Sequence, residues 1–134
     1  MSKSAGADPA SVELSIPVKA DLVVLARLTA ATVASRVGFG IEDIEDLRLA
    51  VEELCLSVVG SARDGRLHLC FDSGDGAISV ECRYEPPPGG APPEASDDAD
   101  LSIRILDALV DDHGREDGPG SCAWLRKRHI GAAG

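Results

Sequence analysis

Residues 46–59 read DLRLAVEELCLSVV and predict an amphipathic helix, which should span about residues 41–61. Its apolar residues recur at helical spacing and should form the buried side: Leu47, Ala50, Val51, Leu54, Val58 and Val59. Glu53 and Ser57 are four residues apart, so they share a neighbouring face of the same helix. A carboxylate and a hydroxyl on one face can point into a pocket, although a solvated Glu and a tolerated Ser would produce the same spacing.

The segment before this helix predicts one strand and one further helix. Val12, Leu14 and Ile16 alternate with polar residues, which is typical of a short, half-buried strand. Asp21 can cap a helix that ends at Gly38, because glycine readily adopts the conformation that closes a helix. That helix carries Leu22, Leu25, Leu28, Ala31, Thr32 and Ser35.

The segment after the helix predicts an antiparallel hairpin. Residues 66–71 and 77–84 alternate with period two around the turn sequence of residues 73–76. A turn centred on Gly74 and Asp75 would place Leu67 opposite Cys82, Leu69 opposite Val80 and Phe71 opposite Ile78. The opposite face would then carry His68, Cys70, Ser79, Glu81 and Arg83. Cys70 and Cys82 would point away from each other, which excludes a disulfide between them.

The remaining residues complete a sandwich of two layers. Residues 86–98 should form a Pro- and Gly-rich loop, and Asp97 or Asp98 can cap a third helix after it. Residues 114–120 should be an acidic loop, and residues 121–128 predict a last strand. The third helix carries Leu101, Ile105, Leu106, Leu109 and Val110. This order predicts an α/β (α+β) two-layer sandwich, with a mixed, mainly antiparallel four-stranded sheet and three helices on one face. We expect one domain over residues 11–129, with a disordered segment at 1–10 and a flexible tail at 130–134.

The charge balance restricts the class of partner. Thirteen Lys and Arg oppose 23 Asp and Glu, which gives a net charge of −10. This charge argues against direct nucleic-acid binding and against anionic membranes, and it favours basic protein surfaces. The basic residues 126–129 are interpreted as a solvated end of a strand. Because residues 1–9 lack the apolar core of a signal peptide and no run of eighteen apolar residues occurs, we expect a cytoplasmic protein.

The four cysteines match no metal or redox motif. Cys55, Cys70, Cys82 and Cys122 are separated by 15, 12 and 40 residues, so no CxxC pair exists. We expect reduced thiols that pack as small, buried apolar residues. A thiol switch that links two protomers through Cys70 is an alternative.

The element order and the helix motif together resemble the GHKL (histidine-kinase/Hsp90-like, Bergerat) ATPase fold, and in particular its small anti-sigma-factor branch, the RsbW/SpoIIAB type. The resemblance covers about residues 10–129, and it extends to residues 26–29 and 34–39 in the first helix and 44–47 at the start of the second. It implies ATP and Mg²⁺ as cofactors and a serine on an anti-sigma-factor antagonist as the substrate. It also places Arg27 on the surface that contacts the sigma factor and the antagonist, although a helix Arg that merely extends over apolar surface would look the same.

The resemblance assigns site roles residue by residue. Glu53 matches the family's general base, and Ser57 stands where the family has the Asn that holds Mg²⁺. Glu85 stands near the position of the Asp that reads adenine, but prolines follow it in place of glycines. Asp100 and Ser102 stand where the family has the glycines of the phosphate-binding lid. The acidic residues Asp97, Asp98 and Asp100 would repel a triphosphate, although carboxylates also stabilise a helix start without any ligand.

Three hypotheses about function remain open. The first is an anti-sigma factor in a stress-response circuit, a homodimer that sequesters a sigma factor, is countered by a STAS-type antagonist, and has weak or lost ATP binding. The second is an active ATP-dependent serine protein kinase that uses Glu53 as base and Ser57 as a metal ligand. The third is a regulatory domain that shares only the fold. Binding of Mg·ATP separates the first two, and co-purification with a sigma factor tests the third.

Overall fold

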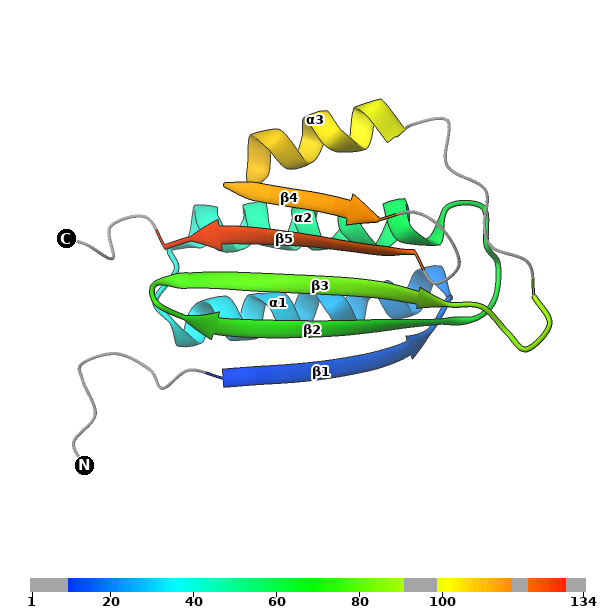
Figure 1. Cartoon of the computed structure of the whole chain (residues 1–134). Helices are drawn as coiled ribbons and strands as arrows, with labels where there is room; N and C mark the ends of the chain where they lie inside the picture. The colour runs from blue at the N-terminus through cyan, green and yellow to red at the C-terminus, as the bar shows by residue number, and fades with distance from the viewer. Residues whose placement is uncertain (1–9, 91–98, 117–120, 130–134) are drawn as a thin grey trace.

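The computed structural model describes residues 10–90, 99–116 and 121–129. Within them, five strands form one antiparallel sheet in the order β1-β2-β3-β5-β4 (Figure 1). The strands are β1 (Ala10–Pro17), β2 (Arg66–Gly74), β3 (Ala77–Glu85), β4 (Asp112–Glu116) and β5 (Cys122–Arg128). The helices are α1 (Val23–Arg36), α2 (Ile41–Val59) and α3 (Ala99–Leu109), and a short 3₁₀ helix, η1 (Ala20–Leu22), precedes α1.

The predicted two-layer architecture is confirmed, with two corrections to the sheet. All four strand pairings are antiparallel, so the sheet is not mixed. The sheet also has a fifth strand, β4, which covers part of the segment expected to be an acidic loop. No pattern in the sequence predicts this strand, since Asp112–Glu116 lack apolar alternation. β4 is an edge strand that is held to β5 by backbone pairing. The rest of that expected loop, residues 117–120, lies outside the described residues.

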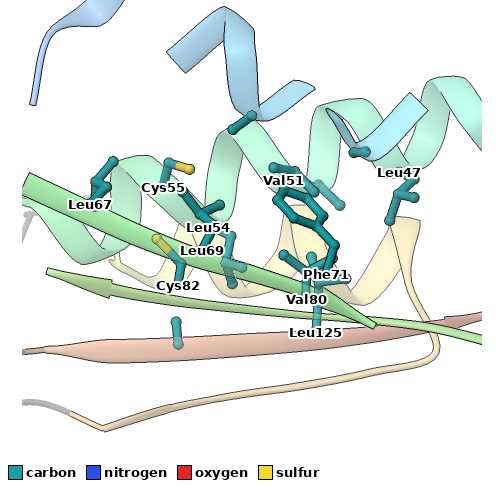
Figure 2. Packing of buried hydrophobic residues seen from close by; sticks show 14 of the residues in the cluster. Leu47, Val51, Leu54, Cys55, Leu67, Leu69, Phe71, Val80, Cys82 and Leu125 are labelled. Carbon is teal, nitrogen blue, oxygen red and sulfur yellow. The ribbon is translucent and has the colours of Figure 1, made fainter. Parts of the chain in front are cut away.

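The helices pack on one face of the sheet. Helix α1 contacts β1 and β2, α2 contacts β3 and β5, and α3 packs beside α2 near β4 (Figure 1). The core is made where α2 meets the sheet, and Figure 2 shows side chains of both layers meeting there. In the part of the chain that the structure describes, no helix is long and apolar enough to cross a membrane.

The predicted face of α2 is confirmed, whereas the leucines of α1 behave differently. Leu47, Ala50, Val51, Leu54 and Val58 are buried, and Val59 is half-buried. The buried side of α1 consists instead of Ala26, Ala30, Val33 and Ala34. Because small residues let α1 lie close to α2 and the sheet, its longer leucines, Leu25 and Leu28, remain exposed.

The ends of the helices follow the sequence only in part. Asp21 lies inside η1 rather than capping α1, whose N-cap is Leu22 and lacks a side-chain capping bond. Gly38 has φ 89°, so it ends α1 as predicted. Asp97 and Asp98, the expected caps of α3, lie outside the described residues, as do the segments 1–9, 91–98 and 130–134.

The hairpin has the predicted faces but a different register. Its two-residue turn is Asp75-Gly76, between Gly74 and Ala77, and both turn residues have positive φ. Leu67 therefore pairs with Tyr84, Leu69 with Cys82 and Phe71 with Val80, a shift of two residues from the expected pairs. A shift of two preserves which side chains face the core, because side chains alternate with period two.

The cysteines divide between the two faces of the sheet. All four are free thiols; Cys55 and Cys82 are buried, whereas Cys70 and Cys122 are half-buried, so the expectation that all four are buried is wrong for two of them. A hydrogen bond with Cys55, together with burial, raises the pKa of the Cys82 thiol well above its usual value. Cys70 lies on the opposite face from Cys82, as predicted, and partial burial raises its pKa as well.

The basic residues near the end of β5 are not all solvated. Arg126 and Arg128 are exposed, but Lys127 is only 6% exposed and lies on the covered face of the sheet. Its Nζ donates a hydrogen bond to the carbonyl oxygen of Leu109 and lies 3.8 Å from Asp43 Oδ1. The interpretation of residues 126–129 as a solvated strand end is therefore wrong for Lys127.

Candidate functional site

The carboxylate of Glu53 lies at the contact between α2 and α3. Ser102 Oγ donates a hydrogen bond to Glu53 Oε2 over 2.5 Å, and Ser102 is 7% exposed. Beside this contact runs a groove of about 380 Å³, lined by Leu49, Glu52 and Glu53 of α2 and by Ile105, Ala108 and Leu109 of α3. The structure thus brings together two of the residues that the sequence singled out, and it pairs them with each other.

Ser57 does not face this groove. It is buried, and its Oγ donates a hydrogen bond to the carbonyl oxygen of Leu54 over 2.8 Å. A serine bonded to its own helix backbone leaves no group that projects toward Glu53. Glu53 and Ser57 share a helix, as their spacing predicted, but their polar groups have different partners.

These residues do not fit a magnesium ion. Mg²⁺ requires near-octahedral oxygen coordination, usually from one or two carboxylates, substrate phosphates and water. Here the hydroxyl at the position of the metal ligand is buried against its own helix. Among the described residues, no group of three His, Cys, Asp or Glu side chains converges on a point that could hold a metal ion.

Glu85 lies on the opposite face of the sheet from Glu53. Along β3, Tyr84 is buried on the covered face, so its neighbour Glu85 projects from the uncovered face. There Glu85 Oε1 lies 2.5 Å from His68 Nε2, and this hydrogen bond lowers the pKa of Glu85 below its usual value. The sheet therefore separates Glu85 from the contact between α2 and α3.

Asp100 lies in the first turn of α3 and is exposed. A carboxylate at this end of a helix stabilises the partial positive charge of the first turn. Ser102, two residues later, faces α2 instead. Of the two residues at the expected lid positions, Asp100 is therefore exposed to solvent and Ser102 is bonded to Glu53 of α2.

Arg27 lies between α1 and α2, where it pairs with Glu52. Arg27 Nη1 is 3.3 Å from Glu52 Oε1, and about a third of each side chain is exposed. Arg27 and Glu52 also line a small hollow of about 100 Å³ together with Val24 and Leu56. Sequence reasoning selected Arg27 but missed Glu52, because residues 25 positions apart carry no local signal of contact.

Exposed apolar side chains lie on the same two helices as this ion pair, and two of them, Val24 and Leu56, line the small hollow together with it. Val24 and Leu28 project from α1, and Leu49 and Leu56 from α2, each with between 37% and 53% of its surface exposed. A helical surface that exposes several large aliphatic residues around one ion pair is typical of a protein-binding site.

A family model of the histidine kinase-like ATPase domain matches residues 16–127. The chain belongs to this family. The match includes α1, α2, α3 and the sheet, apart from the first six residues of β1 and the last residue of β5. The resemblance to the GHKL fold is therefore confirmed.

Curated relatives specify the branch of this histidine kinase-like ATPase family. The chain is 40% identical over 65 residues to the serine-protein kinase RsbW of Halalkalibacterium halodurans, covering 47% of the chain and 40% of that protein. It is 47% identical over 51 residues to the serine-protein kinase RsbW of Bacillus thuringiensis, covering 38% of the chain and 32% of that protein. The aligned stretches thus span less than half of each relative. The chain is a GHKL protein of the RsbW/SpoIIAB type.

Proposed function

We propose that the protein is an anti-sigma factor that sequesters an alternative sigma factor, is countered by a STAS-type antagonist, and binds ATP weakly or not at all. The observation that carries this proposal is the hydrogen bond from Ser102 to Glu53. In a kinase of this type, the corresponding carboxylate must accept a proton from the substrate hydroxyl. Here a hydroxyl of the chain itself occupies that acceptor.

The second support is the fate of the other nucleotide-site positions. Ser57 is bonded to its own helix, Glu85 projects from the far face of the sheet, and Asp100 adds a negative charge at the start of α3. A phosphate-binding helix start presents bare backbone amides, and an acidic side chain there opposes a polyanion. These positions favour a scaffold for protein binding over a nucleotide site.

The third support is the surface around Arg27. Aliphatic side chains on α1 and α2 flank the Arg27–Glu52 pair, which matches the usual anatomy of an interface with an apolar centre and a positioned Arg. Net charge −10 complements basic segments of a partner and speeds encounter, an effect that should weaken with added salt. We propose that both the sigma factor and the antagonist use this surface, that the protein acts in the cytoplasm, and that it forms a homodimer.

A titration with Mg·ATP tests the loss of the nucleotide site. Isothermal calorimetry should show no saturable binding up to millimolar nucleotide. A saturable isotherm that disappears in Glu53→Ala would contradict this proposal. It would instead support the alternative, an ATP-dependent serine protein kinase, which is favoured by the retention of Glu53 and by the names of the RsbW relatives.

Affinity capture from the native cell tests the partner. The full chain should recover a sigma factor and a small antagonist domain, and Arg27→Glu should lower the recovery of both at least tenfold. Arg104→Glu is the matched control, since Arg104 is an exposed Arg of α3. Capture of neither partner, or equal losses in the two variants, would contradict the proposal and leave a regulatory domain for another partner.

A further inference from the structure

A separate hollow of about 540 Å³ lies near the C-terminal part of α2, where this helix meets η1 and the beginning of β2. Its walls include aliphatic side chains from several elements: Val18, Val23, Leu56, Val59 and Leu67. Cys55 also lines it, and Figure 2 shows Cys55 and Leu67 toward the same end of the core. Neither Glu53 nor Ser102 contributes to the lining, so this hollow is distinct from the contact between α2 and α3.

The charged side chains that line this hollow are both basic. Lys19 and Arg63 contribute to it, and both are exposed. Within residues 10–90, 99–116 and 121–129, neither side chain forms an ion pair or a hydrogen bond. Two unpaired cations beside an apolar hollow are notable in a chain with 23 acidic and only 13 basic residues.

We propose that this hollow binds a small apolar carboxylate of the medium-chain fatty acid class. Pockets for small ligands usually enclose about 300–1,000 Å³ and combine apolar walls with a few polar groups that fix orientation. Here the hydrocarbon chain lies against Leu56 and Val59, which have accessible surface, and the carboxylate meets Lys19 and Arg63. Burial of the chain supplies most of the affinity, and charge-assisted hydrogen bonds select the carboxylate over a neutral head group.

The competing explanation for the two cations is structural. Basic side chains near the end of a helix stabilise its partial negative charge without any ligand. The last turn of α2 contains no basic residue, so Lys19 and Arg63, which lie outside the helix, are the cations of this hollow that could act on the C-terminal end of α2. The two explanations differ in whether a carboxylate ligand depends on these side chains.

Calorimetric titration of the full chain with decanoate and with decanol tests the proposal. Decanoate should bind saturably and decanol more weakly, because only decanoate has a charge for the rim. The double variant Lys19→Ala/Arg63→Ala should weaken decanoate binding about tenfold or more. Its affinity for decanol should equal that of the unaltered chain. Arg104→Ala, which removes an exposed charge on α3, should bind decanoate as the unaltered chain does.

Three further readouts make the test specific. Decanoate should shift the amide NMR signals of Ala62 and Leu67 and leave those of Leu101 and Ile103 on α3 in place. Val59→Trp should fill the hollow and abolish binding, with its fold verified by circular dichroism; the rim variants keep the test valid if this variant does not fold. The protein should not co-sediment with vesicles of anionic phospholipid, since the proposed ligand is a free carboxylate.

Several outcomes would overturn the proposal. These are no saturable decanoate binding, equal affinities for decanoate and decanol, no effect of the double variant, or binding to anionic vesicles in place of free decanoate. The proposal does not depend on the anti-sigma function. Failure of decanoate to bind would leave the partner capture and the Mg·ATP titration unaffected.

Discussion

The buried Nζ of Lys127 donates a hydrogen bond to the carbonyl oxygen of Leu109 over 2.8 Å, and it thereby ties β5 to the end of α3. The same ammonium group lies 3.8 Å from Asp43 in the first turn of α2. One lysine of the sheet thus contacts both helices that frame the candidate site. The carbonyl at the end of α3 is one that the helix itself cannot satisfy.

Replacement of Lys127 by Met should destabilise the fold by about 2–4 kcal/mol, because it leaves the Leu109 carbonyl without its hydrogen-bond donor and the Asp43 carboxylate without its positive partner. Urea denaturation followed by circular dichroism measures this change. Arg126→Met is the control, since Arg126 is an exposed neighbour on β5, and it should change stability by less than about 0.5 kcal/mol. Equal effects of the two substitutions would show that Lys127 has no special role.

Replacement of Ser102 by Ala should lower stability by about 1–3 kcal/mol, because the partly buried Glu53 carboxylate loses its donor. Thermal unfolding measures the loss. Ser35→Ala, at an exposed position of α1, makes the same change in helix propensity and should be neutral or slightly stabilising. If Ser102→Ala were as stable as the unaltered chain, the contact between α2 and α3 would not depend on this bond.

Replacement of His68 by Ala should raise the pKa of Glu85 toward its ordinary value, because the hydrogen bond from His68 is the main cause of the lowered pKa. Carboxyl ¹³C NMR over an acid titration measures the change. A carboxyl whose pKa is lowered by folding stabilises the fold above its unfolded pKa, and this contribution is lost as the pH falls through the folded value. His113→Ala, which removes the partner of Asp107, should leave the titration of Glu85 in place.

Replacement of Gly114 by Ala should displace the indole of Trp124, whose ring atoms lie against Gly114. A Cβ atom at Gly114 would lie 2.6 Å from Trp124 Nε1, well inside contact distance. Because Trp124 is the single tryptophan of the chain, its fluorescence reports the displacement directly. An unchanged emission spectrum would show that the indole does not cover Gly114. The matched substitution, Gly40→Ala, meets no atom within 4 Å and should leave the emission unchanged.

Local patterns predicted those parts of the fold in which one face of an element is clearly apolar. The buried stripe of α2, the strand β1 and the two arms of the hairpin follow from periodicity within each segment. The hairpin register was wrong by two residues because it depends on the turn. Asp75-Gly76, whose φ angles are 55° and 73°, was the better turn signal in the sequence.

The candidate site was predictable only as a set of residues. Spacing and family resemblance selected Glu53, Ser57 and Ser102, but no local rule indicates which of their polar groups meet. The Ser102–Glu53 bond joins residues 49 positions apart, and the Arg27–Glu52 pair joins residues 25 positions apart. Such contacts depend on how α1 and α3 pack against α2.

By itself, the sequence determined the inward face of each clearly amphipathic element, because periodicity along one segment specifies it. The order of the elements and the motif in α2 indicated the two-layer architecture and the family. Tertiary structure alone decided that β4 joins the sheet, that Lys127 is buried and that Leu28 is exposed. The physical reason is that burial of a side chain depends on what packs above it. For Lys127 and Leu28 that environment is set by distant segments. Hydropathy alone would predict an exposed Lys127 and a buried Leu28, the opposite of what the structure shows.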